Sequence, residues 1–139
     1  MKKNIEFTYN KAIALGIITE LFLFAVQFVY LKIYSGMNPE APTTFNTEYM
    51  MTRGFYIFQI IGFFVYVVTV YLINSRYTVK ALGVLLAYVI TGGIMELMFY
   101  LIIQAGYQGA FLYSILDKFI AAVFGAIVYY YTSGHESTA

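Results

Sequence analysis

Four long apolar segments, separated by short polar stretches, constrain this chain more than any other feature. They cover about residues 12–31, 54–73, 81–103 and 111–131. Each is close to the roughly 20 residues that a helix needs to cross about 30 Å of hydrocarbon. A transmembrane strand would need only about 9–11 residues of alternating polarity, and no segment alternates in this way. The pattern therefore predicts four membrane-spanning helices.

The composition favours lipid over water as the surrounding solvent. The 139 residues are 61% hydrophobic and 11% charged, whereas soluble domains have about 45–50% apolar and about 25% charged residues. A small soluble domain could not bury so much apolar surface. We predict an all-α integral membrane protein with four transmembrane helices in an antiparallel up-down bundle, forming a single domain over residues 1–139. The expected helices cover about residues 11–33, 47–74, 80–104 and 111–132.

The connections between these segments differ in length. The first contains both prolines, and Asn46 or Thr47 near its end is expected to cap the second helix, with Glu48 in the first turn. The sequences NSRYTV and GYQG make the other two connections short. We therefore expect the second, third and fourth helices to be sequential antiparallel neighbours.

The basic residues outside the apolar segments predict the orientation of the chain. One side of the membrane would carry Lys2, Lys3, Lys11, Arg76 and Lys80, and the other side would carry Lys32 and Arg53. Because basic residues are enriched on the cytoplasmic side, both termini are predicted to be cytoplasmic.

The sequences GIITEL (16–21) and GGIMEL (92–97) share Gly, Ile, Glu and Leu at a spacing of 76 residues. One interpretation is an internal duplication that gives two repeated helical hairpins, as in some small transporters. The other is coincidence, which apolar sequences produce easily. Both interpretations stay open at this point.

Several kinds of chemistry lack the residues they need. The chain has no cysteine, and its single histidine, His135, lies in the polar tail SGHESTA. We therefore predict no metal site, no cofactor and no catalytic residues, and an enzyme is the least favoured class of function. With a net charge of +1, no nucleic-acid partner is expected. The expected partners are the lipid bilayer and either further copies of the chain or other membrane subunits.

Polar and small residues recur at helical spacing within each apolar segment, which predicts one stripe per helix facing the interior of the bundle. The stripes are Gly16, Glu20 and Gln27; Gln59, Gly62, Tyr66 and Thr69; Tyr88, Gly92, Glu96 and Tyr100; and Ser114, Lys118, Ala121 and Gly125. Of these, we expect Gln27, Gln59, Tyr66 and Thr69 to line a cavity. Packing alone is a sufficient explanation for the glycines, alanines and threonines.

The charged residues need partners, because an acid at the centre of a spanning helix costs about 2.5–3.5 kcal/mol. Glu96 lies eleven residues before Tyr107, in the GYQG turn, and Lys118 lies eleven residues after it. An antiparallel hairpin would bring the two to one depth, so we predict a buried ion pair. The pair would either stabilise the structure only or take part directly in function.

Asp117 and Glu20 are less easily paired from the sequence. Asp117 would meet Arg53 near the outer end of the second helix or face water. Glu20 has no cation within reach in a bundle of sequential neighbours, and only Tyr66 and Thr69 lie at its depth. Burial would then favour the protonated form of Glu20. Its role would be proton or ion binding, or stabilising a contact between helices or subunits.

The sequence leaves two classes of function open. The first is a small transporter or channel in which Glu20 and Glu96 bind ions or protons, while Lys118, Asp117 and Arg53 form gating charges or ion pairs. The second is an accessory or structural subunit of a larger membrane complex, in which the polar stripes are docking surfaces.

Overall fold

The computed structural model describes residues 5–44, 47–50, 52–102 and 110–134, and its regular structure consists of five helices. Their bounds are α1 Tyr9–Met37, α2 Thr47–Met50, α3 Arg53–Arg76, α4 Leu82–Ile102 and α5 Ala110–Gly134. The four long helices are each long and apolar enough to cross a membrane. The predicted all-α bundle of four spanning helices is therefore confirmed. The predicted N-cap Asn46, the GYQG turn and His135 lie outside the described residues.

The second predicted helix, over residues 47–74, is divided in two, which corrects its expected start. The single turn α2 contains Glu48, and α3 begins separately at Arg53. Thr52 separates them because its extended backbone and its hydroxyl group, which accepts a hydrogen bond from Phe55 N at 3.3 Å, make it the N-cap of α3. Tyr49 on α2 is fully buried against Tyr34. Burial, and then the nearby Tyr30 and Tyr34, raise the pKa of Tyr49 to about 12.

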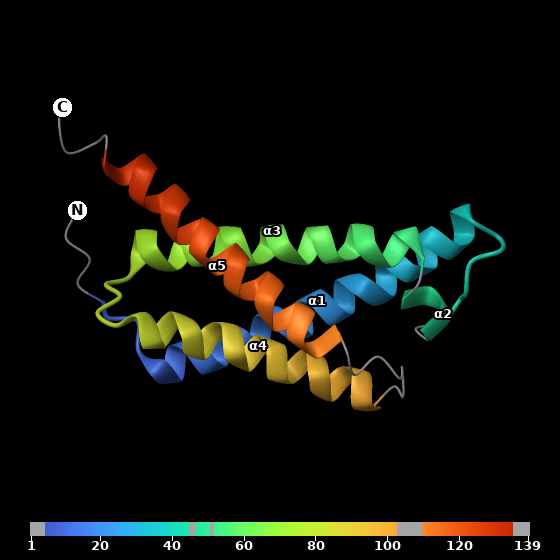
Figure 1. Ribbon diagram of the computed structural model, residues 1–139, viewed down its shortest axis with the longest axis horizontal. Helices are drawn as coiled ribbons and strands as arrows, with labels where there is room; N and C mark the ends of the chain where they lie inside the picture. Colours follow the sequence, from blue (N-terminus) through green and yellow to red (C-terminus); the bar gives the residue numbers. More distant parts are fainter. Residues whose placement is uncertain (1–4, 45–46, 51, 103–109, 135–139) are drawn as a thin grey trace.

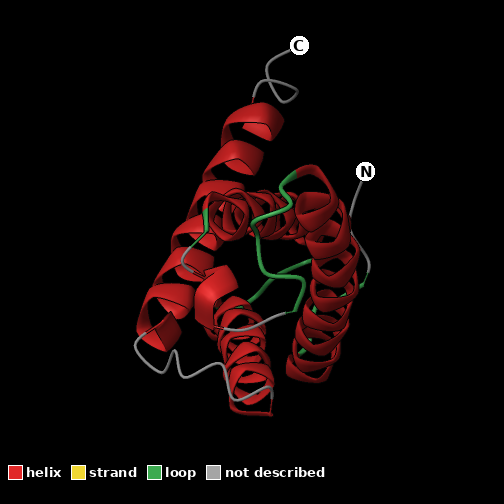
Figure 2. Ribbon diagram, turned by 90° about the vertical axis from the view of Figure 1, so that its right-hand side faces the viewer, coloured by secondary structure: helices red, strands yellow, loops and turns green. Residues whose placement is uncertain are grey.

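The long helices alternate in direction, and α1 begins at the same end of the bundle at which α5 finishes (Figure 1). The extensive contacts join α3 to α5, α1 to α4 and α4 to α5. The expectation that all of the last three helices are sequential neighbours is therefore wrong for α3 and α4, which do not pack along each other within the described ranges. Instead, two pairs of parallel helices form, α1 with α4 and α3 with α5. Figure 2 shows the four long helices around a common interior.

Both parallel pairs approach closely at a glycine. A Cβ atom on Gly125 of α5 would lie 2.5 Å from the backbone carbonyl oxygen of Val67 on α3. A Cβ atom on Gly16 of α1 would lie 3.0 Å from the carbonyl oxygen of Tyr88 on α4. In lipid, no hydrophobic effect drives helices together, and small residues at the interface let their backbones approach closely. Gly16 and Gly125, both from the predicted stripes, therefore set the spacing of the two parallel pairs.

The outer surface of the bundle is apolar. Among the large apolar residues that remain exposed are Ile18, Phe22, Phe64 and Leu116, one or two on each of three spanning helices. Exposed apolar area on this scale marks a surface that contacts something other than water. The described residues therefore have the inside-out character of a membrane protein, with the polar groups in the interior.

One end of the bundle is closed by a contact that we call the N-terminal clasp, formed by residues 5–7 and 78–80. Phe7 N donates to the carbonyl oxygen of Thr78 at 3.1 Å, and Thr78 N donates to the carbonyl oxygen of Ile5 at 2.9 Å. Lys80 forms an ion pair with Glu6 at 2.8 Å. The clasp holds the segment before α1 against the turn between α3 and α4, and Phe7 is buried beneath it.

Candidate functional site

Glu96 on α4 is buried, and hydrogen-bond donors surround its carboxylate group. Tyr100, one turn along the same helix, donates to Oε1 at 2.6 Å. Ser114 and Lys118, one turn apart on α5, both donate to Oε2, and Lys118 Nζ also lies 2.8 Å from Ser114 Oγ. Residues four apart share a helix face, which is why each helix presents two groups to this point. The predicted ion pair between Glu96 and Lys118 is confirmed.

Glu20 on α1 is equally buried but has fewer donors. Tyr66 on α3 donates to Glu20 Oε1 at 2.5 Å. Lys118 Nζ lies 3.4 Å from the same oxygen atom, so the expectation that Glu20 lacks a cation is wrong. The error came from the assumed order of the helices: because α1 packs along α4, Glu20 and Glu96 face the same interior region and the ammonium group reaches both. Of the two residues expected at the depth of Glu20, Tyr66 forms a hydrogen bond with it.

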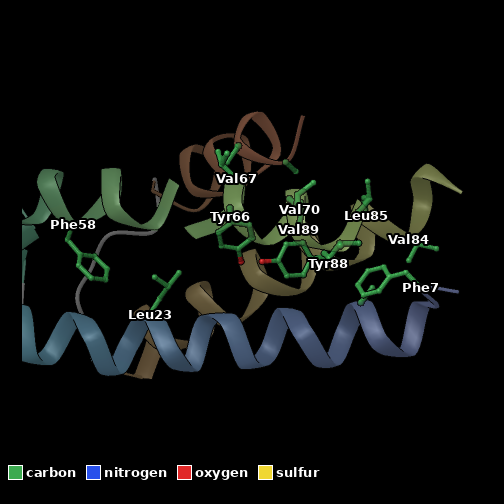
Figure 3. Packing of buried hydrophobic residues seen from close by; sticks show 14 residues of the cluster. Phe7, Leu23, Phe58, Tyr66, Val67, Val70, Val84, Leu85, Tyr88 and Val89 are labelled. Atoms are coloured by element: carbon green, nitrogen blue, oxygen red, sulfur yellow. The ribbon is translucent and has the colours of Figure 1, made fainter. Parts of the chain in front are cut away.

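The surroundings of this cluster are aromatic and polar. Lys118 Nζ lies 5.3 Å from the centroid of the Tyr66 ring, a distance at which a cation is attracted to a ring face. The ring of Tyr88 lies 5.1 Å from that of Tyr66, and the hydroxyl groups of the two tyrosines point toward each other in Figure 3. Tyr88 OH also lies 3.3 Å from Thr19 Oγ1. The charged groups are thus enclosed by hydroxyl groups and ring faces.

A small cavity of about 20 Å³ adjoins the cluster. Its polar lining residues are Glu20, Gln27, Gln59, Tyr66, Glu96, Asp117 and Lys118. This volume suits a single water molecule, which needs about 10–15 Å³ and two to four polar partners. The side-chain nitrogen of Gln27 is buried in this lining and has no hydrogen-bond partner among the described residues. The cavity therefore leaves room for one water molecule beside both carboxylates and the Gln27 amide.

A much larger groove, of about 890 Å³, lies between α3 and α5. Aromatic and aliphatic side chains form its walls, and the few polar residues Gln59, Glu96, Ser114 and Asp117 lie among them. Gln59, Glu96 and Asp117 also line the small cavity. We call this feature the α3/α5 groove. It connects the apolar exterior of the bundle with the charged interior.

Not all of the predicted site residues come together. Glu20, Glu96, Lys118, Gln27, Gln59 and Tyr66 gather around the small cavity. Asp117 lines both spaces, and no ion pair joins it to Arg53 in the part of the chain that the structure describes. Arg53 is exposed at the start of α3. Thr69 lines neither space, and its hydroxyl group donates to the carbonyl oxygen of Val65 at 2.7 Å.

Two donors to Glu96 had no role in the sequence-based prediction. Tyr100 and Ser114 were placed on interior stripes, but only Lys118 was assigned to the carboxylate. The available signal was their spacing, because each lies four residues from a member of the predicted ion pair. That spacing makes a contact possible without establishing it.

Three carboxylate groups and one ammonium group therefore lie in one interior region. Within the described ranges, no three His, Cys, Asp or Glu side chains are placed to hold a metal ion together. No protein family model, no curated protein and no solved structure matches this chain. The chemistry of the site is therefore inferred from its own geometry.

Proposed function

We propose that the protein is a proton-coupled membrane transporter in which Glu20 binds the proton. The observation that carries the proposal is the single ammonium group of Lys118, which contacts the carboxylates of both Glu20 and Glu96. One cation cannot neutralise two anions, and an unneutralised charge inside a membrane protein is costly. A proton on one carboxylate removes the excess charge.

Glu20 is the better candidate for that proton. Glu96 accepts hydrogen bonds from Tyr100, Ser114 and Lys118, and these donors stabilise its ionised form. Glu20 accepts one hydrogen bond from Tyr66 and lies farther from the ammonium group. The cavity beside Glu20 has room for one water molecule, which supplies a path for proton transfer. Glu20 would therefore gain and lose the proton while Glu96 and Lys118 stay paired.

Infrared spectroscopy of the purified protein tests proton binding directly. We expect the wild-type protein at neutral pH to show the carbonyl stretch of a protonated carboxyl group, and Glu20→Gln to lack it. Glu48→Gln removes an exposed acid on α2 and is the matched control, which should retain the band. A band that persists unchanged in Glu20→Gln would contradict the assignment of the proton.

Transport itself is tested in liposomes that contain a pH indicator. The wild-type protein should move protons across the membrane faster than protein-free liposomes, and Glu20→Gln should abolish the difference. The alternative function, an accessory subunit, predicts no flux from the purified protein and a monomer in detergent. A discrete homo-oligomer in detergent together with flux would support the transporter.

A further inference from the structure

The α3/α5 groove has the size and lining of a small-molecule site, and it meets the glutamate cluster at Glu96. Its volume of about 890 Å³ falls within the range of about 300–1,000 Å³ that is typical of ligand sites. Along α3, its wall is aromatic and includes Phe55, Tyr56, Phe63 and Phe64. Such a wall suits a ligand with an apolar body and can also attract a cation to its ring faces.

The charge in the groove is negative and comes from Asp117. Glu96 also lines the groove, but its two oxygen atoms already accept hydrogen bonds from Tyr100, Ser114 and Lys118. The carboxylate of Asp117 is half-buried and takes part in no hydrogen bond or ion pair among the described residues. Asp117 therefore has the capacity to bind a positively charged group that enters the groove.

The groove opens toward the lipid-facing side of the bundle. Tyr56, Ile60 and Phe64 on α3 and Leu116 and Ile120 on α5 line it and are all at least half exposed. Asp117 lies seven residues after Ala110, where α5 begins, which corresponds to about 10 Å along the helix. A ligand that reaches it must therefore leave the head-group layer, which a membrane-dissolved molecule can do more readily than the head group of a lipid.

From these observations we propose that the α3/α5 groove binds an amphipathic organic cation from the bilayer, with its cationic group at Asp117 and its apolar body along the aromatic wall. The binding itself does not depend on the proposed transport. The inference that this cation is the transported substrate rests on the proposed function.

Binding is tested with the full chain in phosphatidylcholine nanodiscs, using radiolabelled octyltrimethylammonium as the probe and empty nanodiscs as the background. Octanol and octyl sulfate are the control ligands. Both have the same octyl tail, but octanol is uncharged and octyl sulfate is an anion. We expect saturable binding of the cation only. Asp117→Asn should lower its affinity about tenfold or more, a difference of about 1.4 kcal/mol or more, and Asp117→Glu should retain part of it.

A second variant tests the groove without changing its charge. Ile60→Trp should block binding by filling the space, whereas Val123→Trp, on the outer surface of α5 away from this groove, should not. Glu48→Gln is the matched control for the loss of an acid. The proposal is overturned if Asp117→Asn binds the cation as the wild-type protein does, or if octanol binds equally well. Octyltrimethylammonium binding that survives in Glu20→Gln, together with an unchanged infrared band in that variant, would refute only the proposed proton site.

Discussion

Glu20 and Glu96 lie on two adjacent parallel helices and both reach the ammonium group of Lys118, but their hydrogen bonds differ. Glu96 has three donors, two of them from α5. Glu20 has the hydroxyl group of Tyr66 and a longer contact with Lys118, at 3.4 Å. In the proposed mechanism, this difference lets one interior contain both a permanently ionised carboxylate and an exchangeable acid. The number of donors, rather than the depth of burial, would then distinguish the two roles.

The largest expected effect comes from removing the shared cation. Lys118→Ala leaves both carboxylates buried without a cation, and we expect it to lower the free energy of unfolding by about 3–5 kcal/mol. The double variant Lys118→Ala/Glu96→Ala should be more stable than the single variant, because it removes the more firmly ionised of the two acids. Unfolding in detergent, followed by circular dichroism, measures both.

The comparison is sharpened by pairing Lys118→Ala with Glu20→Gln instead. If Glu20 is the protonated acid, this double variant should recover less stability than the one with Glu96→Ala. Equal recovery from both would mean that the two carboxylates share the negative charge equally.

A smaller effect is expected when each glutamate is replaced alone. Glu96→Gln loses charge-assisted hydrogen bonds from Ser114 and Lys118, and we expect a loss of about 1.5–3 kcal/mol in stability. Glu20→Gln keeps an oxygen atom that accepts from Tyr66, and an amide replaces a protonated acid almost isosterically, so a loss of about 1 kcal/mol or less is expected. Thermal unfolding of the two variants under identical conditions gives the comparison. A greater loss in Glu20→Gln would reverse the assignment of the exchangeable acid.

The last prediction concerns the space around Glu20. A Cβ atom on Gly92 would overlap the hydroxyl oxygen of Tyr66 and would lie 3.2 Å from Oε1 of Glu20. Gly92→Ala should therefore displace the Tyr66 hydroxyl group from Glu20 and cost about 1 kcal/mol of stability. Gly36→Ala is the matched control, since a Cβ atom there meets nothing within 4 Å and Gly36 lines neither the small cavity nor the groove. Proton flux should fall in Gly92→Ala and not in Gly36→Ala, and equal flux in the two would argue against a role for the Tyr66 contact.

Much of the fold could be predicted from the sequence, because the spans depend on segment length and polarity. The ion pair between Glu96 and Lys118 could also be predicted, since counting from a short turn fixes the relative depth of two residues in a hairpin. The position of Tyr66 at the depth of Glu20 followed from the sequence in the same way. These predictions use distance along the chain, which the sequence contains directly.

The lateral arrangement of the helices could not be predicted in this way. In lipid, apolar residues surround each helix, so no single apolar face indicates which neighbour it packs against. The pairing of α1 with α4 depends on close contacts such as that of Gly16 with the Tyr88 backbone. Without that pairing, the contact between Glu20 and Lys118 was missed, and a contact of Asp117 with Arg53 stayed open beside exposure of Asp117 to water. The break before α3 was missed because a threonine inside an otherwise helical stretch is not a strong stop signal.

The N-terminal clasp has a consequence for how the chain is inserted during synthesis. Phe7 N donates a hydrogen bond to Thr78, which lies 71 residues later in the chain. Thr78 is therefore synthesised only after both α1 and α3. The clasp can close only if the chain crosses the membrane an even number of times between residues 7 and 78. A chain in which either helix failed to insert would leave Phe7 and Thr78 on opposite sides of the membrane, with the hydrogen bonds unmade. Closure of the clasp is therefore incompatible with a topology in which only one of α1 and α3 crosses the membrane.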